Sequence, residues 1–153
     1  MARGHSQLGV AGWLWAGYNV GMSKMVEAWV TGYRNAWETN DPDDIRALFT
    51  EDAEYRTEPY SEPWRGHDEI IDGWLEAADE PGETVFDWSE LASIDDLGIV
   101  EATTAYAGRS TYSNLWVIRF AADGRASRFT EWWMAQPGSS LADTETEADL
   151  DET

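Results

Sequence analysis

The sequence predicts one α+β domain, with helices in its first half and a run of antiparallel strands in its second half. The chain has 153 residues, enough for one domain with a sizeable core and too few to expect two. Apolar residues recur at helical spacing up to about residue 78 and alternate from residue 83 onward. Helices followed by consecutive strands are typical of the α+β class.

Three helices are expected. The first is predicted from Ser23, which can cap it, to Thr39, and the third from His67 to Ala78. The second spans Pro42–Phe49, with Asp41 as its cap and proline in its first turn. One apolar stripe runs along the first helix: Val26, Trp29, Val30, Tyr33, Ala36 and Trp37.

Five strands are expected. A short strand, Ala53–Thr57, separates the second and third helices and leads into a loop, Glu58–Gly66, that contains two prolines. Turn residues such as those of Asp123–Gly124 separate four longer strands and suit hairpins. These four strands are Glu83–Ile94, Ile99–Ala107, Thr111–Ala121 and Arg125–Gln136.

The two ends of the chain differ from its middle. Residues 1–22 are predicted to be a poorly ordered extension, because Leu8–Val20 is rich in glycine and too short to span a membrane. Residues 138–153 turn to Ser, Thr, Asp and Glu, which predicts a disordered acidic tail. The domain itself is therefore expected over residues 23–137.

Charge and composition exclude several kinds of function. The formal net charge of −20 disfavours nucleic acids and anionic membrane surfaces as partners, so we expect a soluble, cytoplasmic protein. The absence of cysteine removes thiolate catalysis and thiolate zinc sites. His5 and His67 lack the spacing of metal ligands, and no glycine-rich phosphate loop is present. We expect neither a metal nor a cofactor.

Several segments carry a resemblance to a known superfamily. They are Ala47–Ala53, Trp64–Ile70, Asn114–Phe120, Asp123–Arg125 and Phe129–Trp133. In this order they resemble the nuclear transport factor 2-like superfamily, which includes SnoaL-like polyketide cyclases and ketosteroid isomerases. The segment Tyr55–Gly66 looks especially like uncharacterised bacterial SnoaL-like proteins. The resemblance implies an α+β barrel, in which a cone-shaped, curved antiparallel sheet wraps around the N-terminal helices and encloses a pocket.

The resemblance to the isomerases is incomplete. Their mechanism uses a carboxylate base and two hydrogen-bond donors to an enolate oxygen. Tyr33 falls at the position of the isomerase tyrosine, but Thr57 falls at the base and Trp116 at the donor aspartate. Because the base and one donor are not matched, the sequence does not predict steroid isomerase activity. The fold alone does not decide the function, since it hosts many different ones.

Glu131 is the carboxylate that the resemblance to the SnoaL-like cyclases singles out. Its neighbours on the same face of the last strand are Phe129 and Trp133. If that face lines the pocket, burial is expected to raise the pKa of Glu131 and make it a general acid or base. The alternative is that Glu131 faces solvent or an interface, or forms an ion pair with Arg56 or Arg128.

Other candidate ligand-binding residues follow from alternation along the strands. Tyr33 is either a core tyrosine or a donor in the pocket, and Asn114 bonds either a neighbour or a ligand. Trp64 is expected as a lid at the pocket mouth. The complete predicted lining is Tyr33, Tyr55, Thr57, Trp64, Asn114, Trp116, Phe129, Glu131 and Trp133.

Three functions remain open from the sequence. The first is an acid–base enzyme without a cofactor, in which Glu131 moves a proton of an apolar carbonyl compound and Tyr33 or Asn114 holds the oxyanion. The second is a binder of a small hydrophobic or amphipathic molecule, without catalysis. The third is an interaction domain, since the resemblance implies a homodimer through the open face of the sheet.

Overall fold

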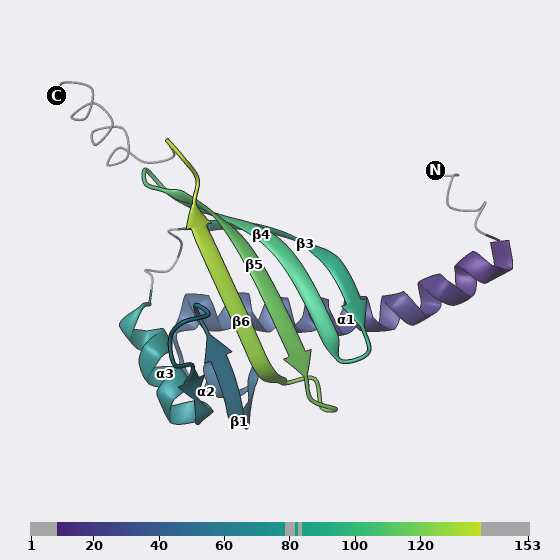
Figure 1. Ribbon diagram of the computed structural model, residues 1–153, viewed down its shortest axis with the longest axis horizontal. Coiled ribbons are helices and arrows are strands. Elements are labelled where there is room, and N and C mark those ends of the chain that lie inside the picture. Colours follow the sequence, from purple (N-terminus) through teal and green to yellow (C-terminus); the bar gives the residue numbers. More distant parts are fainter. Residues whose placement is uncertain (1–8, 79–81, 83, 139–153) are drawn as a thin grey trace.

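A computed structural model describes residues 9–78, 82 and 84–138 of the chain, and its side chains from residue 24 onward. Three helices precede most of the sheet, and four long strands follow them (Figure 1). The helices are α1 (Gly9–Thr39), α2 (Pro42–Arg46) and α3 (Gly66–Glu76). The strands are β1 (Phe49–Arg56), β2 (Trp64–Arg65), β3 (Thr84–Ile94), β4 (Leu97–Tyr106), β5 (Thr111–Phe120) and β6 (Ala126–Ala135).

The strands form one curved, six-stranded sheet in the order β2-β1-β6-β5-β4-β3. The pairs from β3 to β6 are antiparallel hairpins, as predicted. The sheet as a whole is mixed, however, because β1 runs parallel to β6, with Tyr55 opposite Phe129. The prediction of a purely antiparallel sheet is therefore wrong at this pair. The chain passes through α3 and strands β2–β5 between β1 and β6, and β6 then runs beside β1 in the same direction. The sheet curves without closing (Figure 1).

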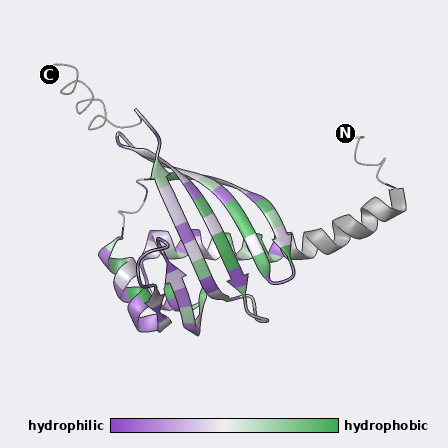
Figure 2. Ribbon diagram, in the orientation of Figure 1, coloured by the Kyte–Doolittle hydropathy of each residue, from purple (hydrophilic) through white to green (hydrophobic). Residues whose placement is uncertain are grey.

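The concave face of the sheet packs against α1 and encloses the core. Hydrophobic and hydrophilic bands alternate along β5 and β6, as expected when one face is buried (Figure 2). Trp116, Ile118 and Phe129 from these strands are completely buried. Trp29 from α1 reaches into the same cluster, with its ring centroid 4.9 Å from that of Phe129. Aromatic rings from α1 and from the sheet therefore make up much of the core.

Helix α1 begins at Gly9 rather than at Ser23, so residues 9–22 of the predicted extension are helical in the structure. No proline interrupts the chain between residues 9 and 39, and proline is the residue that most strongly breaks a helix interior. The remainder of that extension, residues 1–8, and the predicted acidic tail from residue 139 lie outside the described residues. Across the described residues, no helix combines the length and apolar character needed to cross a membrane.

The junction between α1 and α2 follows the predicted capping pattern. Asn40, with φ at 52°, ends α1, and asparagine tolerates this left-handed conformation well. Asp41 caps α2 by accepting a hydrogen bond of 2.9 Å from the backbone N–H of Asp43. Trp74 Nε1 donates to Asn40 Oδ1 at 3.1 Å, which ties α3 to this junction. Helix α2 ends at Arg46, three residues before its predicted end, because Phe49 already begins β1.

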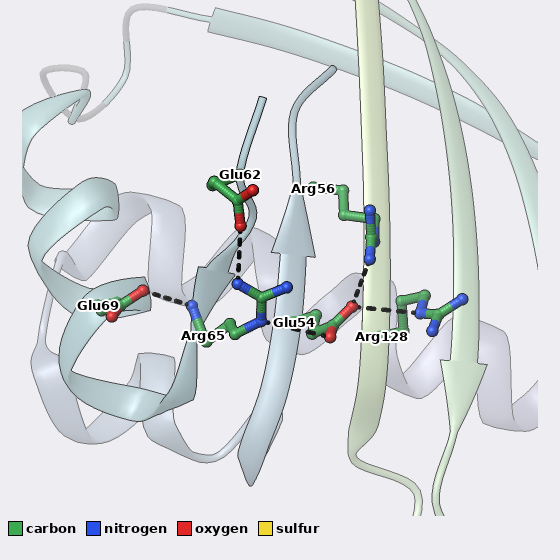
Figure 3. A network of polar contacts seen from close by, with 6 residues as sticks. All are labelled: Glu54, Arg56, Glu62, Arg65, Glu69 and Arg128. Carbon is green, nitrogen blue, oxygen red and sulfur yellow. Dashed lines mark hydrogen bonds and ion pairs between the residues drawn. The ribbon is translucent and has the colours of Figure 1, made fainter. Parts of the chain in front are cut away.

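The convex face of the sheet carries a charged network across β1, β2 and β6 (Figure 3). Its centre is Glu54, whose carboxylate lies 2.8 Å from Arg56 and 3.6 Å from both Arg65 and Arg128. Arg65 also lies 3.0 Å from Glu62, which ties the loop before α3 to this network. The hydrogen bond from Arg56 and the three nearby guanidinium groups lower the pKa of Glu54.

Candidate functional site

A cavity of about 400 Å³ lies between the concave face of the sheet, the C-terminal end of α1, and α3. It lies on the side of the core toward the β4–β5 hairpin. Its walls are mainly aromatic, and its polar groups come from α1, from β1 and the residue after it, from β4, β5 and β6, and from the β4–β5 turn. The lining residues are Tyr33, Trp37, Tyr55, Thr57, Trp64, Trp74, Ala77, Ala78, Thr104, Tyr106, Arg109, Ser110, Tyr112, Asn114, Glu131 and Trp133.

Two tyrosines converge on the Glu131 carboxylate in this cavity. Tyr55 donates a hydrogen bond of 2.6 Å to Glu131 Oε1. The Tyr33 hydroxyl lies 2.8 Å from that of Tyr55 and 3.5 Å from Glu131 Oε1. Because Tyr55 has one hydroxyl proton and gives it to the carboxylate, Tyr33 is the donor between the two tyrosines. A relay from Tyr33 through Tyr55 therefore ends on Glu131.

The second oxygen of the carboxylate is held by an indole. Trp116 Nε1 donates to Glu131 Oε2 at 3.2 Å, although the Trp116 ring is completely buried. The prediction that Trp116 and Phe129 line the pocket is wrong, because both rings lie deeper and pack against Trp29 in the core. Trp116 therefore acts at the site only through its N–H group. Donors to both oxygens stabilise the ionised carboxylate, which opposes the effect of burial expected from the sequence.

Both tyrosines of the relay are buried, with about 5% of Tyr33 and 4% of Tyr55 exposed. Burial, followed by the charge of the nearby Glu131 carboxylate, raises the pKa of each tyrosine well above its ordinary value. Both hydroxyls consequently remain protonated at neutral pH and act as hydrogen-bond donors. The site thus combines one carboxylate with two neutral O–H groups.

Trp64 forms a fixed wall rather than the lid predicted from the sequence. Its ring centroid lies 4.8 Å from that of Tyr55. On its other side it contacts α3 so closely that a Cβ atom at Gly73 would lie 2.4 Å from the Trp64 ring. The absence of a side chain at Gly73 therefore allows Trp64 to pack on the helix and to support Tyr55.

Asn114 contributes a second polar point on the cavity wall. Its Oδ1 atom accepts a hydrogen bond of 2.8 Å from Thr104 Oγ1 on the neighbouring strand. Both side chains are buried and line the cavity. This bond occupies the amide oxygen, so the group that Asn114 offers to a ligand is its NH₂.

Several lining residues were not among the predicted site residues. Trp37 lies one helical turn after Tyr33, and this spacing was a usable signal. Trp74 belongs to α3, and its place at the cavity depends on how α3 packs against β1. Tyr106 is the last residue of β4, and Arg109 lies in the β4–β5 turn, where no periodicity indicates which side chains face inward.

Arg56, Arg128 and His67 all lie away from the Glu131 carboxylate. Arg56 and Arg128 lie with Glu54 on the convex face, so they are not the ion-pair partners of Glu131. His67 Nε2 lies 2.8 Å from the carbonyl oxygen of Phe49, and His67 is not among the residues that line the cavity. Within the described part of the chain, no group of three or more His, Asp or Glu side chains is placed to hold a metal ion.

Comparison with known families gives one match. The family described as SnoaL-like domain matches residues 30–129, which is more than half of the chain. These residues include Tyr33, Tyr55 and Asn114, and the match ends two residues before Glu131. No curated protein matches the sequence.

Solved structures with the same fold are numerous and distant in sequence. An NTF-2 like protein of unknown function from Burkholderia xenovorans is 14% identical, with a TM-score of 0.61 over 81% of this chain and 94% of that chain. A SnoaL-like protein of unknown function from Burkholderia thailandensis is 19% identical, with a TM-score of 0.58 over 72% and 95%. A putative ketosteroid isomerase from Kribbella flavida is 20% identical, with a TM-score of 0.57 over 72% and 78%. At this identity they confirm the predicted nuclear transport factor 2-like fold.

Proposed function

Because the chain belongs to the SnoaL-like domain family, we propose that its cavity is the active site of an acid–base enzyme that acts on an apolar carbonyl compound. The observation that carries the proposal is the convergence of Tyr33 and Tyr55 on the Glu131 carboxylate inside an aromatic cavity. A carboxylate beside neutral O–H donors is the combination that enolisation requires: a base for carbon and a donor for oxygen. Proton transfer of this kind needs no cofactor.

In the proposed reaction, Glu131 removes a proton from the carbon next to a ketone. The proton passes to the carboxylate, the C–H electron pair forms a C=C bond, and the π pair of the C=O bond moves to the oxygen. Return of the proton to the same or another carbon re-forms the C=O bond and completes exchange or isomerisation. Tyr33 is the better donor to the developing oxyanion, because its proton goes to the Tyr55 hydroxyl and can turn to the ligand while the bond from Tyr55 to Glu131 stays in place. Tyr55, at 2.6 Å, positions the carboxylate.

A binder without catalysis is the second candidate, and one observation favours it. Both oxygens of Glu131 already accept hydrogen bonds, from Tyr55 and from Trp116. These bonds stabilise the ionised carboxylate and make it a weaker base. In this alternative, the polar cluster would hold a ligand carbonyl or hydroxyl, and the tryptophan walls would supply most of the binding energy.

One assay separates the two candidates. The probe is 4-acetylbiphenyl, a flat apolar methyl ketone, and NMR follows deuteration of its methyl group in D₂O while calorimetry measures its binding. The enzyme proposal predicts exchange above the buffer rate and a loss of roughly 100- to 10,000-fold in Glu131→Gln. Binding with no exchange above the buffer rate would reject the enzyme proposal and support the binder.

We also propose that the chain forms a homodimer through the convex face of its sheet. Leu115, Trp132 and Met134 surround a shallow hollow on this face, and each is at least one-third exposed. Exposed apolar side chains that gather on one sheet face are typical of interfaces. Light scattering should give twice the chain mass for the wild type and a shift toward the monomer for Trp132→Lys, and a monomeric wild type would refute the dimer.

A further inference from the structure

We propose that the ligand of this cavity carries an anionic group at the end opposite its carbonyl, and that Arg109 at the mouth of the cavity binds this group. The inference deepens the proposed function and depends on it for the placement of the carbonyl beside Glu131. It rests on the opposite charges of two lining residues, on the distance between them and on the turn that holds Arg109.

The β4–β5 turn fixes Arg109 beside the cavity. Tyr106 and Ser110 close the turn through a backbone hydrogen bond of 3.1 Å, and the Arg109 N–H donates to the Tyr106 carbonyl at 2.9 Å. Gly108 supplies a left-handed residue with φ at 70°. The Arg109 guanidinium lies over the Tyr106 ring, 5.1 Å from its centroid, and both residues line the cavity. Arg109 is also exposed, so its guanidinium is held at the solvent side of the cavity, which we take as the mouth.

Arg109 and Glu131 are at opposite ends of the lining. Glu131 on β6 pairs with Trp116 on β5, whereas Arg109 precedes Thr111, the first residue of β5. Five residue steps separate Trp116 from Thr111, which correspond to about 17 Å of strand. The tip of the β4–β5 hairpin lies next to the C-terminal end of β6, beyond Glu131 along that strand (Figure 1).

The cavity thus has a carboxylate at its inner end, aromatic walls along its length and a guanidinium at its mouth. Of the lining residues that the structure describes, Arg109 carries a positive charge and Glu131 a negative one. An anion approaching a chain of net charge −20 is repelled over most of the surface, so a local cation at the mouth is what would make an acidic ligand acceptable. The ligand class that fits is an elongated, flat, apolar keto acid.

The test compares two probes that differ only at the outer end. They are 4′-acetylbiphenyl-4-carboxylic acid and its primary carboxamide, and calorimetry measures the affinity of each for the whole chain. The wild type should bind the acid roughly fivefold more tightly than the amide, because an exposed guanidinium–carboxylate pair contributes about 1 kcal/mol at most. Added salt should reduce this preference.

Arg109→Gln should abolish the preference for the acid while it leaves binding of the amide unchanged. Arg119→Gln is the matched control, because Arg119 is an exposed arginine that pairs with Asp96 and does not line the cavity. Equal affinities of the wild type for acid and amide, a preference that persists in Arg109→Gln, or no binding of either probe at millimolar concentration would each overturn the inference. If the acid is preferred but neither ketone exchanges its methyl protons, the proposed enzyme function fails and the anion site remains.

Discussion

Two carboxylates lie on opposite faces of the β1–β6 pair, and their surroundings differ in charge. Glu131 faces the cavity and accepts hydrogen bonds from neutral groups, the hydroxyl of Tyr55 and the indole N–H of Trp116. Glu54 faces the convex side and lies within 3.6 Å of three arginines (Figure 3). Neutral donors orient a carboxylate without cancelling its charge, whereas guanidinium groups neutralise it.

The difference explains why only one of the two carboxylates is suited to proton transfer. A base must be accessible to a ligand, and Glu131 lines a cavity whereas Glu54 is surrounded by the arginines that hold β1, β2 and β6 together. Strand geometry makes this separation sharp, because neighbouring residues such as Glu54 and Tyr55 project to opposite faces. Proton chemistry is therefore assigned to the concave face of this pair of strands, and ion pairing to its convex face.

The largest effect on stability is expected on the concave face. Phe129→Ala should lower the free energy of unfolding by about 3–5 kcal/mol, because it removes a completely buried ring from the core. Arg128→Ala, one residue earlier on the convex face, should cost less than about 1 kcal/mol. Urea unfolding of both variants measures the difference, and equal losses would mean that the two faces are not divided in this way.

The next largest effect is expected on exchange of the ketone. Tyr33→Phe should slow methyl deuteration of 4-acetylbiphenyl by roughly 100-fold, since it removes the donor to the oxyanion. Tyr55→Phe should slow it by roughly tenfold and move the acidic limb of the pH–rate profile to higher pH, because the carboxylate loses a hydrogen bond that stabilises its charged form. A larger loss in Tyr55→Phe than in Tyr33→Phe would reverse the two roles.

A third effect is a loss of stability at high pH that originates on the concave face. The folded chain holds the pKa of Tyr33 and Tyr55 above the unfolded value of about 10. The unfolded chain therefore releases these protons first, and the stabilisation is complete below about pH 10 and disappears as pH rises through the folded pKa values. Urea unfolding from about pH 9 to pH 11 should show a steeper fall for the wild type than for Tyr33→Phe/Tyr55→Phe. Parallel curves would contradict the assignment.

The smallest effect belongs to the convex face at low pH. Because the pKa of Glu54 is lowered in the folded chain, its stabilisation is present above the unfolded value of about 4.3 and is lost as pH falls through the folded value. Glu54→Gln should therefore lower stability near neutral pH by no more than about 1 kcal/mol and flatten the acid dependence. An unchanged acid dependence in this variant would place the effect elsewhere.

The sequence predicts this molecule best where the interactions are local. Alternation along β6 correctly placed Glu131 on the face of Phe129, and Asp41 was identified as a cap from three neighbouring residues. Alternation gives the face of a residue but not its depth, which is why Trp116 was predicted in the pocket when only its N–H group reaches the site. How deeply Trp116 is buried depends on its contact with Trp29 of α1, which is distant in the sequence.

The features that sequence reasoning missed are long-range or lie in turns. The parallel pairing of β1 with β6 joins segments more than 70 residues apart, and no local pattern encodes it. The fixed position of Trp64 depends on Gly73 on the facing helix, and the place of Arg109 depends on the twist of a hairpin. The resemblance to a known superfamily predicted the curved sheet around the helices, but these contacts define the chemistry of the cavity.

The pH dependence of ketone exchange tests the central claim most directly. Methyl deuteration of 4-acetylbiphenyl is measured across acidic and neutral pH for the wild type, Glu131→Gln and Glu54→Gln. The account predicts that the wild-type and Glu54→Gln rates rise together as one carboxyl group ionises, and that the rate of Glu131→Gln stays at the buffer value throughout. Exchange by Glu131→Gln at the wild-type rate, or its loss in Glu54→Gln alone, would contradict the assignment of Glu131 as the base.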